Sequence, residues 1–237
     1  MTISLVQSIA IRGPGSGAGS FSSPTTAGNC VVVLILTYSS SNVMIATSAV
    51  TLGGAAGNFG QAVAVQSGFA SGDTQYAGAW VDPACAGGQT AVAVTVSNGT
   101  WDNGAGLILM EFSGVAASSA VDVTSPSSAT SGTAVSSGTT GGTAVANEMA
   151  VGIAYPDNGL SAESGTFTNI LLGPSSPYTG AAGYLLLGGS GSTTSYTGTG
   201  NSSGVWAALV LTLKPAIAFT AALPFTVSQA VNRAATY

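Results

Sequence analysis

Few residues of this chain could do acid–base chemistry. Its 237 residues include eight carboxylates, three basic side chains and no histidine, and the net charge is −5. Catalysis near neutral pH uses a group that titrates there, most often histidine, or a dense cluster of acids and bases. A serine nucleophile would lack its usual base, and the lone lysine, Lys214, stands beside a proline near the end of the predicted fold. We therefore expect a protein that is not an enzyme and that holds no cofactor.

The eight carboxylates could form either of two kinds of functional site, a catalytic pair or a calcium site. Two of them could face one another as in a glycosidase, and Asp82, Asp102 and Asp157 could bind calcium. These three aspartates stand next to Pro, Asn or Gly in turn contexts, where aspartate more often caps its own backbone. We expect turn caps and no metal site. The glycine-rich run 13–19 is not a phosphate loop, because neither Gly-Lys-Ser/Thr nor a helix follows it.

The chain has two cysteines, Cys30 and Cys85. Without histidine or a CxxC pair they do not predict a zinc site. One alternative is that both are small buried hydrophobic residues. The other is a disulfide between them, formed after release into an oxidising medium. The sequence leaves both alternatives open.

Aromatic side chains could contact sugars through their apolar ring faces. Trp80 and Trp206 lie in predicted strands and are expected in the core. Trp101 lies between two turn signals and has Asp102 and Asn103 beside it. These three residues are the candidate glycan contact.

The hydrophobic pattern predicts strands throughout and no helix. Segments 61–66 and 90–96 alternate between apolar and polar residues with the period of a strand, and 31–36 is a continuous apolar run typical of a central strand. Gly, Asn and Asp pairs mark turns between these segments. We expect an all-β, antiparallel β-sandwich.

The domain prediction is one sandwich over residues 1–215 followed by an extension, 216–237. A weak internal repeat relates about 25–114 to 145–215. An apolar segment beyond a finished sandwich needs a surface to cover it, so the extension is predicted to be an assembly arm that packs on another subunit. Packing on its own sandwich is the open alternative. The predicted assembly contacts are the apolar residues Ile217, Phe219, Leu223, Phe225 and Val227.

Charge also bears on partners and location. Three basic residues far apart in sequence do not supply the phosphate contacts of a nucleic-acid-binding protein or a polybasic membrane patch. The first twelve residues lack the pattern of a signal peptide, and the longest apolar run is too short for a membrane helix. We expect synthesis in a cytoplasm, with no nucleic-acid or membrane partner.

Three motifs carry a resemblance to a known family: "EFSG" at 111–114, "NEMAVG" at 147–152 and "WAALVLTLKP" at 206–215. Together with neighbouring strand patterns over about 25–215, they resemble the jelly-roll sandwich modules of tailed-bacteriophage virion proteins, which also occur in bacterial surface proteins. The resemblance implies a jelly-roll fold, a place on the virion exterior, and contacts with other copies of the chain and other virion subunits. It supplies no catalytic residues.

Three functions follow as hypotheses. The first is a bacteriophage structural protein, either a capsid decoration or a minor tail protein, that assembles as a homo-oligomer through apolar contacts. The second is a carbohydrate-binding or adhesive module that recognises host-surface glycans. The third is an extracellular filament subunit joined by strand exchange through residues 1–12 or 216–237.

Overall fold

The regular structure of this protein is built from β-strands. The computed structural model describes residues 2–41, 43–67, 74–102, 104–173 and 180–217, and within these ranges the regular elements are sixteen strands. The strands are β1 (Ser4–Arg12), β2 (Ala18–Ser20), β3 (Cys30–Ser39), β4 (Ala46–Leu52), β5 (Gly60–Gln66), β6 (Thr74–Asp82), β7 (Ala91–Ser97), β8 (Gly106–Ser113), β9 (Val121–Ala129), β10 (Ala134–Ser136), β11 (Met149–Pro156), β12 (Leu160–Glu163), β13 (Thr168–Leu171), β14 (Ala181–Leu186), β15 (Thr197–Gly200) and β16 (Trp206–Leu213). The predicted all-β, antiparallel sandwich class is confirmed.

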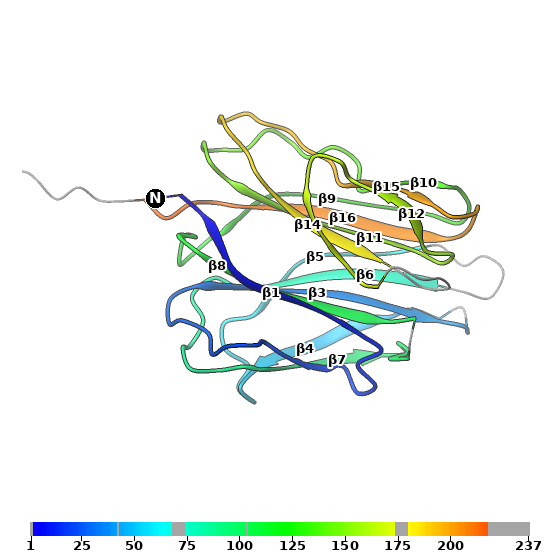
Figure 1. Cartoon of the computed structure of the whole chain (residues 1–237), viewed down its shortest axis with the longest axis horizontal. Helices are drawn as coiled ribbons and strands as arrows, with labels where there is room; N and C mark the ends of the chain where they lie inside the picture. The colour runs from blue at the N-terminus through cyan, green and yellow to red at the C-terminus, as the bar shows by residue number, and fades with distance from the viewer. Residues whose placement is uncertain (1, 42, 68–73, 103, 174–179, 218–237) are drawn as a thin grey trace, which may run out of the picture.

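The strands form four stacked sheets. The two inner sheets have the orders β1-β8-β3-β6-β5 and β13-β14-β11-β16-β9, and the outer ones are β2-β7-β4 and β10-β15-β12. Figure 1 shows the stack edge-on, with β4 and β7 on one side and β10, β12 and β15 on the other. The chain is therefore two sandwiches packed back to back through their inner sheets.

The two sandwiches have the same strand order. Adding eight to each strand number of the first half (β1–β8) gives the second half (β9–β16), in the inner and in the outer sheet. The sequence predicted one sandwich over 1–215 with a weak repeat of 25–114 in 145–215. The structure has four sheets instead of two, and the repeat also takes in β1, β2, β9 and β10. Both halves share a central core, so they form one packed unit.

The continuous apolar run in β3 is explained by burial on both faces. Val32 and Leu34 face the second half and cluster with Val151 and Ile153 of β11 in the central core. Val31, Val33 and Ile35 lie on the opposite face of β3, toward the outer sheet of the first half. Each such side chain contributes about 1.5–3 kcal/mol when fully buried. An isolated first half would expose its share of the central core to water.

Each half also has an outer core beneath its outer sheet. In the first half, Val33 of β3 packs with Val50 of β4 and Val92 of β7. In the second, Tyr196 packs edge-on against Phe167, with ring centroids 5.0 Å apart. These cores fix the outer sheets on the inner ones.

Polar contacts tie the halves together. The Tyr155 hydroxyl of β11 donates to the backbone oxygen of Gly104, and the Ser128 hydroxyl of β9 donates to Gln66 O at 2.8 Å. After β16, Ala216 N donates to Gly114 O at 2.7 Å, so the end of the second half pairs with the last residues of the first.

Candidate functional site

The predicted glycan contact lies at a turn beside β3. Trp101 is half-buried against the first outer core, and Asp102 is exposed. Asp102 Oδ1 accepts a hydrogen bond from Gly104 N at 2.8 Å, and Oδ2 accepts one from the Tyr38 hydroxyl at 2.5 Å. Asp102 therefore caps its own turn, as predicted, and the Trp101 side chain beside it is only partly buried. Asn103 lies outside the described residues.

The glycine-rich run 13–19 wraps Trp101. Gly15 N donates to Trp101 O at 3.0 Å. A Cβ added to Gly17, whose φ is +71°, would lie 2.9 Å from Trp101 Cε2 and 2.5 Å from Val94 O. Because no larger residue fits there, the run serves to seat the indole ring.

Other sequence predictions concern side chains that are structural. Asp82 is buried and accepts hydrogen bonds from Ala84 N at 3.1 Å and Asn58 N at 3.3 Å, which is the predicted turn cap. Trp206 is buried in the second outer core, and Trp80 packs against the first. Trp206 is a core residue, as predicted, whereas Trp80 is only half-buried at the edge of the core.

Cys30 and Cys85 are free thiols in this structure, and both are buried. Burial raises the pKa of each thiol, and the neighbouring Asp82 carboxylate raises that of Cys30 further. A raised pKa keeps a cysteine in the unreactive thiol form. Both thiols are thus small buried side chains here, and a disulfide formed in an oxidising medium stays a prediction.

Of the predicted assembly contacts, the structure describes Ile217, which is 78% exposed. Phe219, Leu223, Phe225 and Val227 lie outside the described residues. The assembly arm 216–237 stays a prediction.

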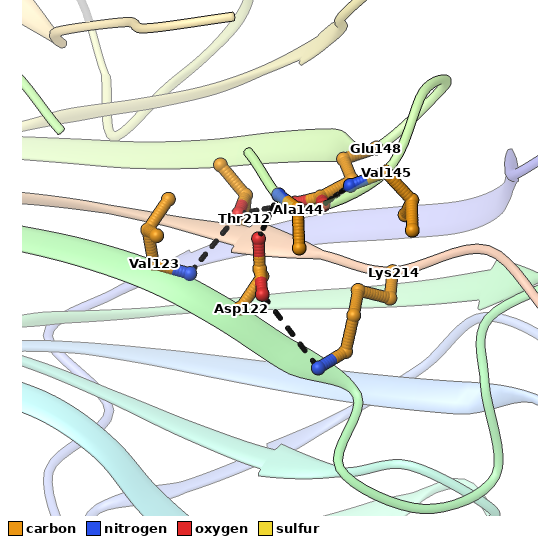
Figure 2. A network of polar contacts seen from close by, with 7 residues as sticks. All are labelled: Asp122, Val123, Ala144, Val145, Glu148, Thr212 and Lys214. Carbon is orange, nitrogen blue, oxygen red and sulfur yellow. Dashed lines mark hydrogen bonds and ion pairs between the residues drawn. The ribbon is translucent and has the colours of Figure 1, made fainter. Parts of the chain in front are cut away.

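A polar cluster that sequence reasoning did not assemble lies where β9, β11 and β16 meet. It contains Asp122, Glu148 and Lys214, the chain's lone lysine. Lys214 Nζ lies 3.7 Å from Asp122 Oδ1, with the side chains 27% and 12% exposed respectively. Figure 2 shows the Lys214 ammonium directed at the Asp122 carboxylate. We call these three residues the carboxyl–lysine cluster.

Backbone and hydroxyl donors hold both carboxyl groups of the cluster. Ala144 N donates to Asp122 Oδ2 at 2.6 Å. Glu148 is fully buried, and it accepts hydrogen bonds from the Thr212 hydroxyl at 2.6 Å and from Val145 N at 3.2 Å. The loop before β11 is thus fastened to β9 and β16 through two acids.

The two acids of the cluster have pKa values displaced in opposite directions. Burial raises the pKa of Glu148, and the hydrogen bond and charge of Asp122 raise it further. Burial also acts to raise the pKa of Asp122, but the Ala144 N–H, Glu148 and the Lys214 ammonium outweigh it and lower the net value. Glu148 is therefore the group of the pair that holds a proton more readily.

The first half has a related cluster in the same place. Glu111 of β8 is buried and accepts hydrogen bonds from Gln7 Nε2 at 2.6 Å, Thr26 N at 2.8 Å and Asn29 Nδ2 at 2.7 Å. Strand register puts Glu111 at the position of Thr212, and Asn29 at that of Glu148. Ser113 takes the position of Lys214. The first half thus has one carboxylate among amides, and the second has two carboxyl groups and a lysine.

The outward face of the first outer sheet is hollowed. A recess of about 440 Å³ lies over Gly19, Thr51, Ala91 and Ala93. Small side chains make its floor, and no charged side chain is among those that line it. A second recess, of about 360 Å³, lies at the seam between the halves and includes Gln61, Pro83 and Ser119.

Comparison with family models, with curated proteins and with solved structures finds no match to this chain. Among the residues the structure describes, no group of three or more Cys, Asp or Glu side chains is placed to hold a metal ion. The described part of the chain has no helix long and apolar enough to cross a membrane.

Proposed function

We propose that this chain is a non-enzymatic structural protein of a bacteriophage particle, a capsid decoration or a minor tail protein on the particle exterior. The two antiparallel sheets of each half support the proposal: in the first half β1-β8-β3-β6 and β2-β7-β4 follow the order of a jelly roll, while β5 departs from it by extending the inner sheet beside β6. The motifs that resemble phage virion modules lie on or beside β8, β11 and β16, which are interior strands of the inner sheets and not edge strands.

The observation that carries the proposal is the uncharged outer surface of the first half. The outward side chains of β7 are Ala91, Ala93, Thr95 and Ser97, all exposed. Charged residues are depleted at the centre of protein–protein interfaces, and small uncharged side chains let another surface approach closely. The recess over Ala91 and Ala93 offers such a surface to a neighbouring subunit.

The proposal is tested by finding the chain in intact particles. Antibodies raised against the purified protein should label the outside of phage particles from a culture that carries the gene, and mass spectrometry of gradient-purified particles should detect the chain. Ala93→Glu, on the proposed contact face, should lower its occupancy. The matched control is Thr168→Glu, at an exposed position of the edge strand β13. Purified particles without the chain would refute the proposal.

A carbohydrate-binding or adhesive module is the second candidate, favoured by the surroundings of Trp101. The half-buried indole and the exposed Asp102 carboxylate are neighbours at one turn, and the Tyr38 hydroxyl of β3 donates a hydrogen bond to that carboxylate. A ring face beside a carboxylate is suited to a sugar. Binding on a glycan array that Trp101→Ala abolishes would support this function, and an array without binding would remove it.

Strand exchange between subunits is the third candidate. The N-terminal segment is already used within the chain, since β1 pairs along its length with β8 of the same sheet. Of residues 216–237, Ala216 pairs with Gly114 of the same chain. Exchange would therefore involve residues 218–237, and crosslinking of these residues to a neighbouring sheet is the experiment that tests it.

A further inference from the structure

The backbone on which the lone lysine stands is fixed on both sides. Lys214 N donates to Ala120 O at 2.7 Å, and Lys214 O accepts from Ala116 N at 2.9 Å. These bonds attach Lys214 to the segment that joins the two halves. Because the Lys214 backbone is held in place, only the side-chain torsions of Lys214 have to be fixed for the ammonium to reach Asp122.

The position of Asp122 follows from an irregularity in strand pairing. The register between β9 and β16 shifts between Leu211 and Leu213, so that two residues of β9, Asp122 and Val123, lie opposite Thr212. A bulge of this kind turns a side chain away from the regular alternation. The Ala144 N–H then holds Asp122 Oδ2, and Oδ1 is left facing the lysine.

The third member of the cluster, Glu148, could move protons. Its carboxyl group is fully buried, and its hydrogen bonds to Thr212 and Val145 fix its orientation. Its raised pKa, caused first by burial, favours the protonated acid that hydrogen bonds to Asp122. An acid so placed can give a proton to a leaving oxygen and take one from an attacking nitrogen.

We propose that Lys214 and Asp122 become joined by an intramolecular isopeptide bond, with Glu148 as the proton-transfer group. The ammonium first gives a proton to the Asp122 carboxylate. The neutral Nζ attacks Cγ, protonated Glu148 gives its proton to the departing oxygen, which leaves as water, and the resulting Glu148 carboxylate takes the proton from the nitrogen. An ammonium and a carboxylate are thereby replaced by one amide and one water, so charge and atoms balance without any other reactant.

Proximity accelerates this condensation. Held groups react with effective molarities of about 10⁵–10⁸ M when their atoms lie within about 3–3.5 Å. The distance of 3.7 Å between Nζ and Oδ1 places the amine beside the carboxyl group, and a side-chain rotation that turns Nζ from Oδ1 toward Cγ would start the attack. The Ala144 N–H at Oδ2 polarises the carboxyl carbon and stabilises the oxyanion that forms on attack.

The first half serves as an internal comparison. It has a buried carboxylate, Glu111, in the corresponding cluster, but Ser113 stands at the lysine position. No amide can form there. The bond is thus predicted in the second half alone, where it would fasten the start of β9 to the end of β16.

The mass of the intact protein tests the proposal directly. The purified full chain should be lighter than its sequence mass by one water. After denaturation, an amine-reactive label should attach at the N-terminus but not at Lys214, the only lysine. A chain with the full sequence mass and a labelled Lys214 would overturn the proposal.

Three variants assign the chemistry to named groups. Lys214→Arg keeps the positive charge and should restore the full mass, whereas a mass loss that persists in it overturns the bond. Asp122→Asn should form the same amide with loss of ammonia instead of water. Glu148→Gln keeps hydrogen-bonding capacity and should leave the amine free, while Glu111→Gln, its matched control in the first half, should crosslink like the wild type. Bond formation in Glu148→Gln at the wild-type rate would overturn the role of Glu148.

Discussion

The hydroxyl group of Tyr155, on β11 of the second half, donates a hydrogen bond to the backbone oxygen of Gly104 in the first half. Both partners are buried. Tyr155→Phe would leave that oxygen without this donor, which costs about 1–3 kcal/mol. Denaturant unfolding measures the loss, and Tyr184→Phe, at a half-buried tyrosine of β14, should cost less. An equal effect of the two substitutions would show that the hydrogen bond between Tyr155 and Gly104 adds nothing to stability.

The shared central core predicts that the two halves unfold together. Leu34 of β3 and Ile153 of β11 belong to one cluster that neither half can bury alone. Calorimetry of the full chain should show one transition. Leu34→Ala should lower the stability of the whole chain by about 2–5 kcal/mol. Two separate transitions, with only one moved by Leu34→Ala, would contradict this expectation.

Gly17 and Gly15 make a matched pair for testing how Trp101 is seated. Both have positive φ, +71° and +62°, so alanine at either costs about 1–2 kcal/mol of backbone strain. A Cβ at Gly17 would in addition meet the indole ring and Val94 O, whereas a Cβ at Gly15 meets nothing within 4 Å. Gly17→Ala should therefore be the more destabilising and should alter Trp101 fluorescence. Equal losses in thermal unfolding would argue against the close seating.

The buried thiols give stability a dependence on alkaline pH. The pKa of Cys30 is raised in the folded chain, so the folded state holds its proton more tightly than the unfolded one. The protonated Cys30 thiol therefore contributes fully to the free energy of unfolding below the ordinary thiol pKa, and this contribution is lost as the pH rises above that value. Stability should fall over that range, less so in Cys30→Ala. The native thiols should react with Ellman's reagent only upon unfolding, and rapid reaction of the native chain would contradict their burial.

Deletion of residues 218–237 tests the predicted assembly arm. The described sheets and the pairing of Ala216 with Gly114 stay intact in the shortened chain, so it should fold with unchanged thermal stability. If residues 218–237 anchor the protein, the shortened chain should be missing from purified particles. Normal occupancy of the shortened chain would show that another surface makes the contact.

The sequence predicts the inner sheets well and the outer sheets only in part, since it predicts β7 from the alternation in 90–96 but gives no such signal for the shortest outer strands. β3 and β16 carry apolar residues on both faces, a pattern that predicts central strands. β2 reads Ala-Gly-Ser and β15 Thr-Gly-Thr-Gly, which have no apolar alternation to detect. Because the outer sheets depend on such strands, the sequence predicted one sandwich where the structure has two.

The carboxyl–lysine cluster escaped prediction for a related reason. Asp122, Glu148 and Lys214 lie far apart in sequence, and strand pairing and a one-residue bulge bring them together. Motifs made of neighbouring residues do not predict contacts between residues so far apart in the sequence. A usable signal was present, since each of these three charged residues lies at or beside the end of an apolar segment that forms β9, β11 or β16. The turn caps at Asp82 and Asp102 were predictable because they involve neighbours in the chain.

The duplication has a consequence for how this protein withstands dilution. When two identical sandwiches pair as separate molecules, mass action separates them at low concentration, and the apolar faces between them become exposed. Here the equivalent faces belong to one chain and are joined by the short connection between β8 and β9. Their association is intramolecular, so its strength does not change with the amount of protein present. The central core therefore remains closed even for a single molecule far from any other copy.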